Sequence, residues 1–349
     1  MKTFYYLFSK AILLGMALGL AACSHTPYPQ SKNYDQEAHV FQNSDGSKNN
    51  KGFFELLGLA SSYFSRPDDP HEKTGFPAKT WTKEELTKIN DEVIWIGHAS
   101  LLLNHNGVNV LTDPVFSDRA SPFQFAGPKR ASPLPFAIKD LPKIDIVLIS
   151  HSHYDHLDKG AIIDLSRYQP DAQYFVPLGL KSVIESWGAK NVTEMDWWDE
   201  VDYNGIRLTA TPMKHWSSRT PFDRNKTLWA GFKLDWPDFS FYFIGDTGYT
   251  DDYKTVRERL GTPDLVGIPI GAYNPRDFMK DAHVNPEEAV QILKDLGAPK
   301  AVPLHWGTFK LTLEPLAEPP ERLRSALDAA QLSGQDFVVL QHGGTTSIR

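Results

Sequence analysis

The feature that most constrains this chain is the run Ser-His-Ser-His-Tyr-Asp-His at positions 150–156, which follows the apolar stretch 144–149. The apolar stretch predicts a buried strand, so the run begins a loop at the strand's end. Three imidazoles and a carboxylate on one short loop would cost folding stability unless a cation offset their desolvation. The alternative is a polar surface loop with chance histidines, but only 12 histidines occur among the 349 residues. We therefore predict that His151, His153, Asp155 and His156 are metal ligands.

Further ligands are expected where other apolar, strand-like segments end. Three such segments lead into His215, Asp246 and His305. Taken singly, each residue has a structural explanation, as a rim histidine, a turn former and a core histidine. Because loops at one edge of layered sheets converge, we expect all three to meet the first loop.

Seven ligands are too many for one tetrahedral zinc ion and suit two ions that share a carboxylate. We expect His151, His153 and His215 at the first metal, Asp155, His156 and His305 at the second, and Asp246 as the bridge. A water or hydroxide would complete both shells and supply the nucleophile. Two Zn²⁺ are the expected cofactors, with Mn²⁺ or Fe as alternatives.

Two more residues end strand-like segments and are expected to support the ligands. Asp113 follows the apolar stretch 108–112 and is the candidate to orient a ligating histidine. A purely structural turn before Pro114 is the alternative for Asp113. His98 follows a strand-like segment at 93–96, and we expect it to support the site from below without being a ligand.

Three residues are candidates to contact the substrate. His283 precedes a helix start with Asn as N-cap and Pro at the first position, and it is the candidate to protonate the leaving group. An exposed loop histidine is the alternative for His283. Tyr154 and Tyr249 lie next to ligands in the sequence and are expected to contact a phosphate, with simple packing as the alternative.

The ligand pattern resembles the metallo-β-lactamase superfamily in its dinuclear, phosphodiesterase-like form. Shorter motifs in the same order, between about residues 88 and 345, resemble the phospholipases D that hydrolyse N-acylphosphatidylethanolamine; they include Gly97-His98-Ala99-Ser100, Gly245-Asp246-Thr247-Gly248-Tyr249 and His305-Trp306-Gly307-Thr308-Phe309. The resemblance implies an α/β fold, the αββα four-layer sandwich, with two zinc ions. It also implies zinc-dependent hydrolysis of a phospholipid phosphodiester to phosphatidate and N-acylethanolamine. The alternative is a hydrolase of lactones or soluble phosphodiesters on the same site.

The amino terminus resembles a bacterial lipoprotein signal peptide over residues 1–22. Residues 1–10 carry two lysines and no acid, residues 11–20 are apolar, and small residues lead into Cys23, the only cysteine. We expect Cys23 to be lipidated, with a plain secretory signal or an uncleaved anchor as alternatives. The expected location is the cell envelope, on the periplasmic side of a bacterial membrane and at the outer membrane if there are two.

The rest of the chain divides into a flexible tether, 23–52, and a hydrolase domain, 53–349. The tether is polar and lacks apolar periodicity, whereas residues 53–59 favour a short amphipathic helix. Further helices are predicted at 159–167, 251–260, 286–296 and 320–330. The expected partners are a phospholipid substrate and a membrane. A net charge of −7 disfavours binding to nucleic acid.

Overall fold

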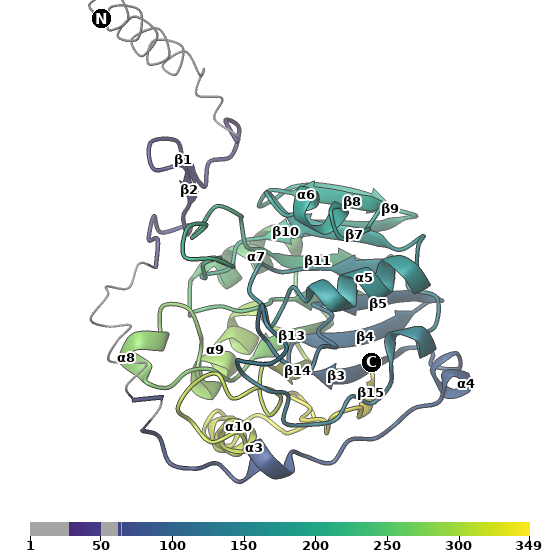
Figure 1. Ribbon diagram of the computed structural model, residues 1–349, viewed down its shortest axis with the longest axis vertical. Coiled ribbons are helices and arrows are strands. Elements are labelled where there is room, and N and C mark those ends of the chain that lie inside the picture. Colours follow the sequence, from purple (N-terminus) through teal and green to yellow (C-terminus); the bar gives the residue numbers. More distant parts are fainter. Residues whose placement is uncertain (1–27, 50–61, 64) are drawn as a thin grey trace, which may run out of the picture.

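The computed structural model describes residues 28–49, 62–63 and 65–349 (Figure 1). Two β-sheets pack between layers of helices, which is the αββα sandwich that the sequence predicts. The expected signal peptide at 1–22, the lipidated Cys23 and the amphipathic helix at 53–59 lie outside the described residues. Among the helices that are described, none has the length and apolar character needed to cross a bilayer.

The first sheet has seven strands, and its two faces build two different cores. In spatial order the strands are β15 (Thr345–Ser347), β3 (Glu92–Gly97), β4 (Ser100–His105), β5 (Val108–Thr112), β6 (Ile146–Leu148), β7 (Gln173–Pro177) and β8 (Asn191–Met195). Pairing is antiparallel from β15 to β5 and parallel from β5 to β8. Because successive side chains alternate, Trp95 joins the core between the sheets and Ile94 the core on the outer face. Helices η1 (Ile138–Asp140), α5 (Lys159–Tyr168) and α6 (Lys181–Glu185) contribute to that outer core.

The second sheet has six strands. In spatial order they are β14 (Ala301–Leu304), β13 (Leu265–Pro269), β12 (Ser240–Phe243), β11 (Gly231–Asp235), β10 (Ile206–Thr211) and β9 (Glu200–Tyr203). Helix α9 (Pro286–Leu296) packs against β13 and contacts α7 (Asp252–Leu260) and α10 (Glu318–Ala329). Short helices α3 (His71–Thr74), α4 (Lys83–Leu86) and α8 (Arg276–Met279) lie in the connections. The parallel strands β12, β13 and β14 point their carboxyl ends the same way, which gathers the loops that follow them.

The predicted helices form close to their expected positions. Helix α9 begins and ends where the sequence predicts, because Asn285 and Glu288 form a reciprocal capping box and Gly297 adopts the left-handed conformation that ends a helix. Helix α10 begins two residues before the predicted start at Pro320, since Pro319 is also compatible with the first turn.

The structure differs from the flexible tether that the sequence predicts for residues 23–52. Of these, residues 28–49 are described, and they carry the hairpin of β1 (Tyr34–Asp35) and β2 (Val40–Phe41). Phe41 is fully buried, and its ring lies 5.1 Å from Tyr28 and 5.0 Å from Tyr34. Three aromatic residues in a polar background are enough to hold the segment on the domain.

Candidate metal centre

The seven predicted ligands come together at the ends of four strands. His151, His153, Asp155 and His156 lie on the loop after β6, whereas His215 follows β10, Asp246 follows β12 and His305 follows β14. His151, His156, His215, Asp246 and His305 are buried, and His153 and Asp155 are half-buried. We call these seven residues the metal cluster.

Three imidazoles form the first corner of the metal cluster. His153 Nδ1 lies 2.8 Å from His151 Nε2 and 3.2 Å from His215 Nε2. The His215 Nδ1–H donates to the carbonyl of Ala282 at 2.9 Å, which leaves the Nε2 lone pair facing the centre. Burial lowers the pKa of His153 to about 3, so this ring is neutral at pH 7. Three neutral imidazoles that face one point suit a divalent metal.

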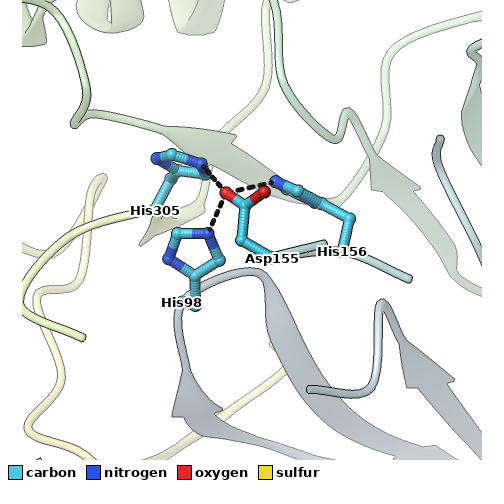
Figure 2. A group of neighbouring side chains, drawn as sticks. All are labelled: His98, Asp155, His156 and His305. Atoms are coloured by element: carbon cyan, nitrogen blue, oxygen red, sulfur yellow. Dashed lines mark hydrogen bonds and ion pairs between the residues drawn. The ribbon is translucent and has the colours of Figure 1, made fainter. Parts of the chain in front are cut away.

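The second corner combines a carboxylate with imidazoles (Figure 2). Asp155 Oδ2 lies 3.2 Å from His305 Nε2 and 3.5 Å from His156 Nε2. It also accepts a hydrogen bond of 2.8 Å from Nε2 of His98, a residue for which the sequence predicts only a supporting role. His98 is buried, and its ring centroid is 4.0 Å from that of His305. It therefore belongs to the same group of side chains as the second-corner ligands.

Asp246 lies between the two corners. Its Oδ2 is 3.0 Å from Nε2 of both His156 and His305, and 4.0 Å from Nε2 of His215. Burial would raise the pKa of Asp246, but the surrounding imidazoles hold it well below the usual range. An ionised carboxylate in this position can reach both corners, as a bridging ligand must.

The side chains present fit two divalent cations. Asp246 Oδ1 and His153 Nε2 are buried polar atoms of the metal cluster without a hydrogen-bond partner, and each such atom costs about 1–3 kcal/mol when left unpaired. Burial opposes protonation of His305, yet Asp246 and Asp155 raise its pKa to about 9. Without metal, protons therefore compensate the carboxylates. The donors are nitrogen and oxygen only, which suits zinc, manganese or iron.

Asp113 orients one of the ligating rings from beneath the cluster. His156 Nδ1–H donates to Asp113 Oδ2 at 2.6 Å, so the Nε2 of the same ring faces Asp246. The backbone N–H of Ser150 donates to Asp113 Oδ1 at 2.7 Å, and the Ser150 hydroxyl donates to Oδ2 at 2.5 Å. Asp113 is fully buried and lies where the predicted supporting role requires it.

The three candidate substrate-contacting residues lie at different distances from the metal cluster. His283 Nδ1 is 3.8 Å from Asp246 Oδ2, and burial lowers its pKa to about 4. Tyr154 donates its hydroxyl to the carbonyl of Arg219 at the wall of a neighbouring cavity. Tyr249 instead donates to Asp295 Oδ2 on α9 at 2.6 Å. The hydroxyl of Tyr249 is thus bonded to a carboxylate on α9, and the contact of Tyr249 with a phosphate stays a prediction.

Asn43 is a further supporting residue, and it lies in the segment predicted to be a tether. Its Oδ1 accepts hydrogen bonds of 3.0 Å from the backbone N–H of His215 and from the indole N–H of Trp229. The side chain is buried, and Asp45 nearby pairs with Lys214 at 2.8 Å. No sequence signal indicates this role, because Asn43 lies far from the ligands along the chain. His98 did carry a signal, since it follows a strand as the predicted ligands do.

Comparisons with known proteins agree with this geometry. Residues 108–306 match the family model described as the beta-lactamase superfamily domain. N-acyl-phosphatidylethanolamine-hydrolyzing phospholipase D 1 of Caenorhabditis elegans is 37% identical over 317 residues, which cover 87% of this chain and 89% of the relative. The mitochondrial enzyme of that name from Saccharomyces cerevisiae is 37% identical over 273 residues, or 73% of this chain and 58% of the relative. The structure of an isothiocyanate hydrolase from Delia radicum gut bacteria shares the fold, with a TM-score of 0.58, 21% identity, and coverage of 73% and 98% of the two chains.

Proposed function

The chain belongs to the beta-lactamase superfamily, and on that premise we propose that it cleaves the phosphodiester bond of N-acylphosphatidylethanolamine-type phospholipids. The reaction would be of the phospholipase D type and would release phosphatidate and N-acylethanolamine. The observation that carries the proposal is the relative with that activity in its name, which is 37% identical and covered over 89% of its length. The coarser conclusion, a metal-dependent hydrolase, rests also on the buried His and Asp groups of the metal cluster.

We propose two zinc ions as the cofactors. His151, His153 and His215 would hold one ion, Asp155, His156 and His305 the other, and Asp246 both. When bound, the two cations would stabilise negative charge on phosphoryl oxygens and make a neighbouring water acidic enough to attack at neutral pH. A phosphodiester is a suitable substrate because its reaction develops charge on oxygen atoms.

Three side chains at the site have proposed roles in orienting a ligand, the attacking water and the leaving group. Asp113 holds the His156 ring so that Nε2 faces the centre. Asp246 is proposed to orient the attacking water through the carboxylate oxygen that has no partner, Oδ1. His283 lies beside Asp246 and is neutral at pH 7, because burial lowers its pKa to about 4. It is therefore proposed to donate an N–H hydrogen bond to the leaving oxygen, which takes up a proton from solvent water while the attacking water gives one up.

The proposed lipid anchor fits this substrate. An acyl chain on Cys23 would hold the enzyme at the surface of a bacterial membrane, where phospholipids are concentrated. The anchor and the location in the cell envelope are proposals that rest on the sequence of residues 1–23.

The test is to identify the products by mass spectrometry. Zinc-loaded full-length protein is mixed with N-acylphosphatidylethanolamine micelles, and a chelator-treated sample is the control. We expect phosphatidate and N-acylethanolamine in the zinc-loaded sample alone. If that sample forms no phosphatidate but hydrolyses a lactone or a soluble phosphodiester, the substrate proposal is wrong. The coarser conclusion, a metal-dependent hydrolase, would still hold.

A further inference from the structure

A cavity of about 420 Å³ lies beside the metal cluster and carries an excess of positive charge. Tyr154, which lies between two ligands in the sequence, forms part of its wall together with Arg119, Lys159 and Arg219. The acidic residue of this wall is Asp158, and its carboxylate accepts hydrogen bonds from neighbouring backbone N–H groups and from the Ser117 hydroxyl. The three cations therefore face the cavity with one carboxylate among them.

Four large apolar side chains in or next to the segments that line this cavity are exposed to solvent. Phe222 is 84% exposed, Phe125 81%, Phe123 57% and Ile163 44%. Ile163 lines the cavity itself. Phe123 and Phe125 flank Gln124, which also lines it, and Phe222 follows Arg219 by three residues. We call these four residues, three phenylalanines and one isoleucine, the aromatic rim.

The aromatic rim is a concentration of exposed apolar surface. Among the residues that the structure describes, six large hydrophobic side chains are exposed, and four of them belong to the rim. The remaining two are Tyr168 and Val339. Exposed apolar surface that is grouped, and not scattered, marks a contact with a partner or a membrane.

The loops that carry the phenylalanines are held by hydrogen bonds that do not involve the rings. Arg119 donates through Nε to the carbonyl of Gln124 at 3.1 Å and through Nη1 to the carbonyl of Gly127 at 2.6 Å. Asp223 Oδ1 accepts from the backbone N–H groups of Arg219 and Thr220 at 3.0 and 2.8 Å. The backbone thus presents Phe125 and Phe222 outward at little further entropic cost on binding.

We propose that the aromatic rim docks the protein onto an anionic phospholipid bilayer. Phe125 and Phe222 would enter the boundary between head groups and acyl chains, and Lys159 and Arg119 would meet the phosphates. Charge complementarity selects this occupant: the chain carries a net charge of −7, so an anionic surface repels it except where cations gather. The inference deepens the proposed function, because it places the metal cluster beside the surface that would hold a lipid substrate.

The first experiment places a polarity-sensitive fluorophore on the rim of the full-length chain. Cys23→Ser removes the native thiol, and Phe222→Cys supplies the labelling site. Val339→Cys, at a side chain that is 41% exposed away from the rim, gives the matched control. The vesicles are phosphatidylcholine with or without phosphatidylglycerol, and they contain no N-acylphosphatidylethanolamine.

We expect the label at position 222 to shift to the blue and brighten several-fold on anionic vesicles, while the label at position 339 changes little. The response at 222 should weaken in high salt, because exposed charges are screened. Equal responses at both positions, or a silent label at 222 on protein that sediments with the vesicles, would overturn the docking proposal.

The second experiment tests the charge of the surface. Lys159→Glu should raise the lipid concentration needed for half-maximal response roughly fivefold or more, since each basic residue near an anionic surface contributes measurably to binding. Lys190→Glu, an exposed lysine on another part of the chain, should have a smaller effect. Equal effects of the two substitutions would contradict the proposal that the surface around Lys159 faces the bilayer. These vesicles contain no substrate, so docking is measured independently of hydrolysis. A protein that docks here but forms no phosphatidate in the product assay would contradict the substrate proposal and leave the docking proposal intact.

Discussion

The metal cluster and the aromatic rim are neighbours, but they are built in opposite ways. The ligands of the cluster follow strands, and hydrogen bonds to residues outside the cluster hold them in place. Asp113 holds His156, and Ala282 and Asn43 hold His215. The three phenylalanines of the rim lie on loops, where Phe125 and Phe222 are exposed to solvent, and Ile163 lies on α5. In the function proposed above, the chemistry depends on rigid strand ends, and the preference for lipid over water-soluble substrates depends on loops that other members of the fold can change.

The largest expected effect comes from removing the shared carboxylate. Asp246→Asn should lower turnover roughly 10³-fold and remove bound metal, because the metals supply several kcal/mol of charge stabilisation. Metal content by mass spectrometry and activity on a soluble phosphodiester are measured on the same sample. Asp328→Asn, an exposed change on α10, is the control. Unchanged metal content and turnover in Asp246→Asn would contradict the bridging role.

A smaller loss is expected when the residue behind a ligand is changed. Asp113→Asn should lower metal affinity about 10- to 100-fold, as is usual for groups that orient ligating histidines. A competition titration with a chelator measures the affinity, and Asp164→Asn on the exposed side of α5 serves as the control. Circular dichroism of the metal-free variant checks the fold. Wild-type affinity in folded Asp113→Asn would show that His156 needs no such partner.

Metal affinity should rise with pH, by up to about tenfold per pH unit for each proton released. The pKa of His305 in the metal-free protein is raised from 6.5 to about 9, so at pH 7 the ring is protonated and must release its proton to bind metal. By the same linkage, the stabilising contribution of His305 to the metal-free protein is fully present below pH 6.5 and is lost as the pH rises through about 9. Calorimetry in buffers of different ionisation enthalpy counts the released protons. Binding at pH 7 without proton release would contradict this assignment.

The amino-terminal segment should have a moderate effect on the first corner. Asn43→Ala leaves the buried backbone N–H of His215 without its acceptor, while the Trp229 indole keeps the carbonyl of Met213, and the free energy of unfolding should fall by about 1–3 kcal/mol. We also expect zinc affinity to fall several-fold, because the backbone of His215 loses a hydrogen bond. Urea unfolding and chelator competition measure the two quantities. Asn191→Ala, at an exposed position on β8, should change neither, and equal behaviour of the two variants would contradict the role of Asn43.

The smallest effect on the chemistry is expected at the rim. The double variant Phe125→Ser, Phe222→Ser should hydrolyse a soluble phosphodiester at a rate within about twofold of the wild type, since exposed substitutions rarely disturb a fold. Its rate on phospholipid vesicles should fall much further. Parallel assays of variant and wild type give the rate on vesicles relative to the rate on the soluble substrate. An equal loss on both substrates would remove the distinction between rim and cluster.

The same contrast explains how much the sequence predicts. Ligands at strand ends follow a local pattern, so the sequence predicts the loop 150–156 and the later His215, Asp246 and His305, and the structure brings them together. His98 follows the same pattern and donates a hydrogen bond to Asp155 of the cluster, whereas the sequence predicts for it only a supporting role.

Contacts between distant segments leave no such pattern. The packing of Asn43 beneath His215 joins residues 172 positions apart, and the hydroxyl of Tyr249 is held by Asp295, 46 positions away. Neither contact follows from local periodicity or residue type. The aromatic rim likewise depends on which phenylalanines remain outside the core, which only the folded chain decides.

The most direct test of the central claim is a metal titration of the metal-free full-length protein, with hydrolysis of a soluble phosphodiester followed at each step. If the seven ligands hold two cations, activity should rise until two zinc ions are bound per chain and then level off. Full activity at one zinc ion per chain, or activity that persists without metal, would contradict the dinuclear account.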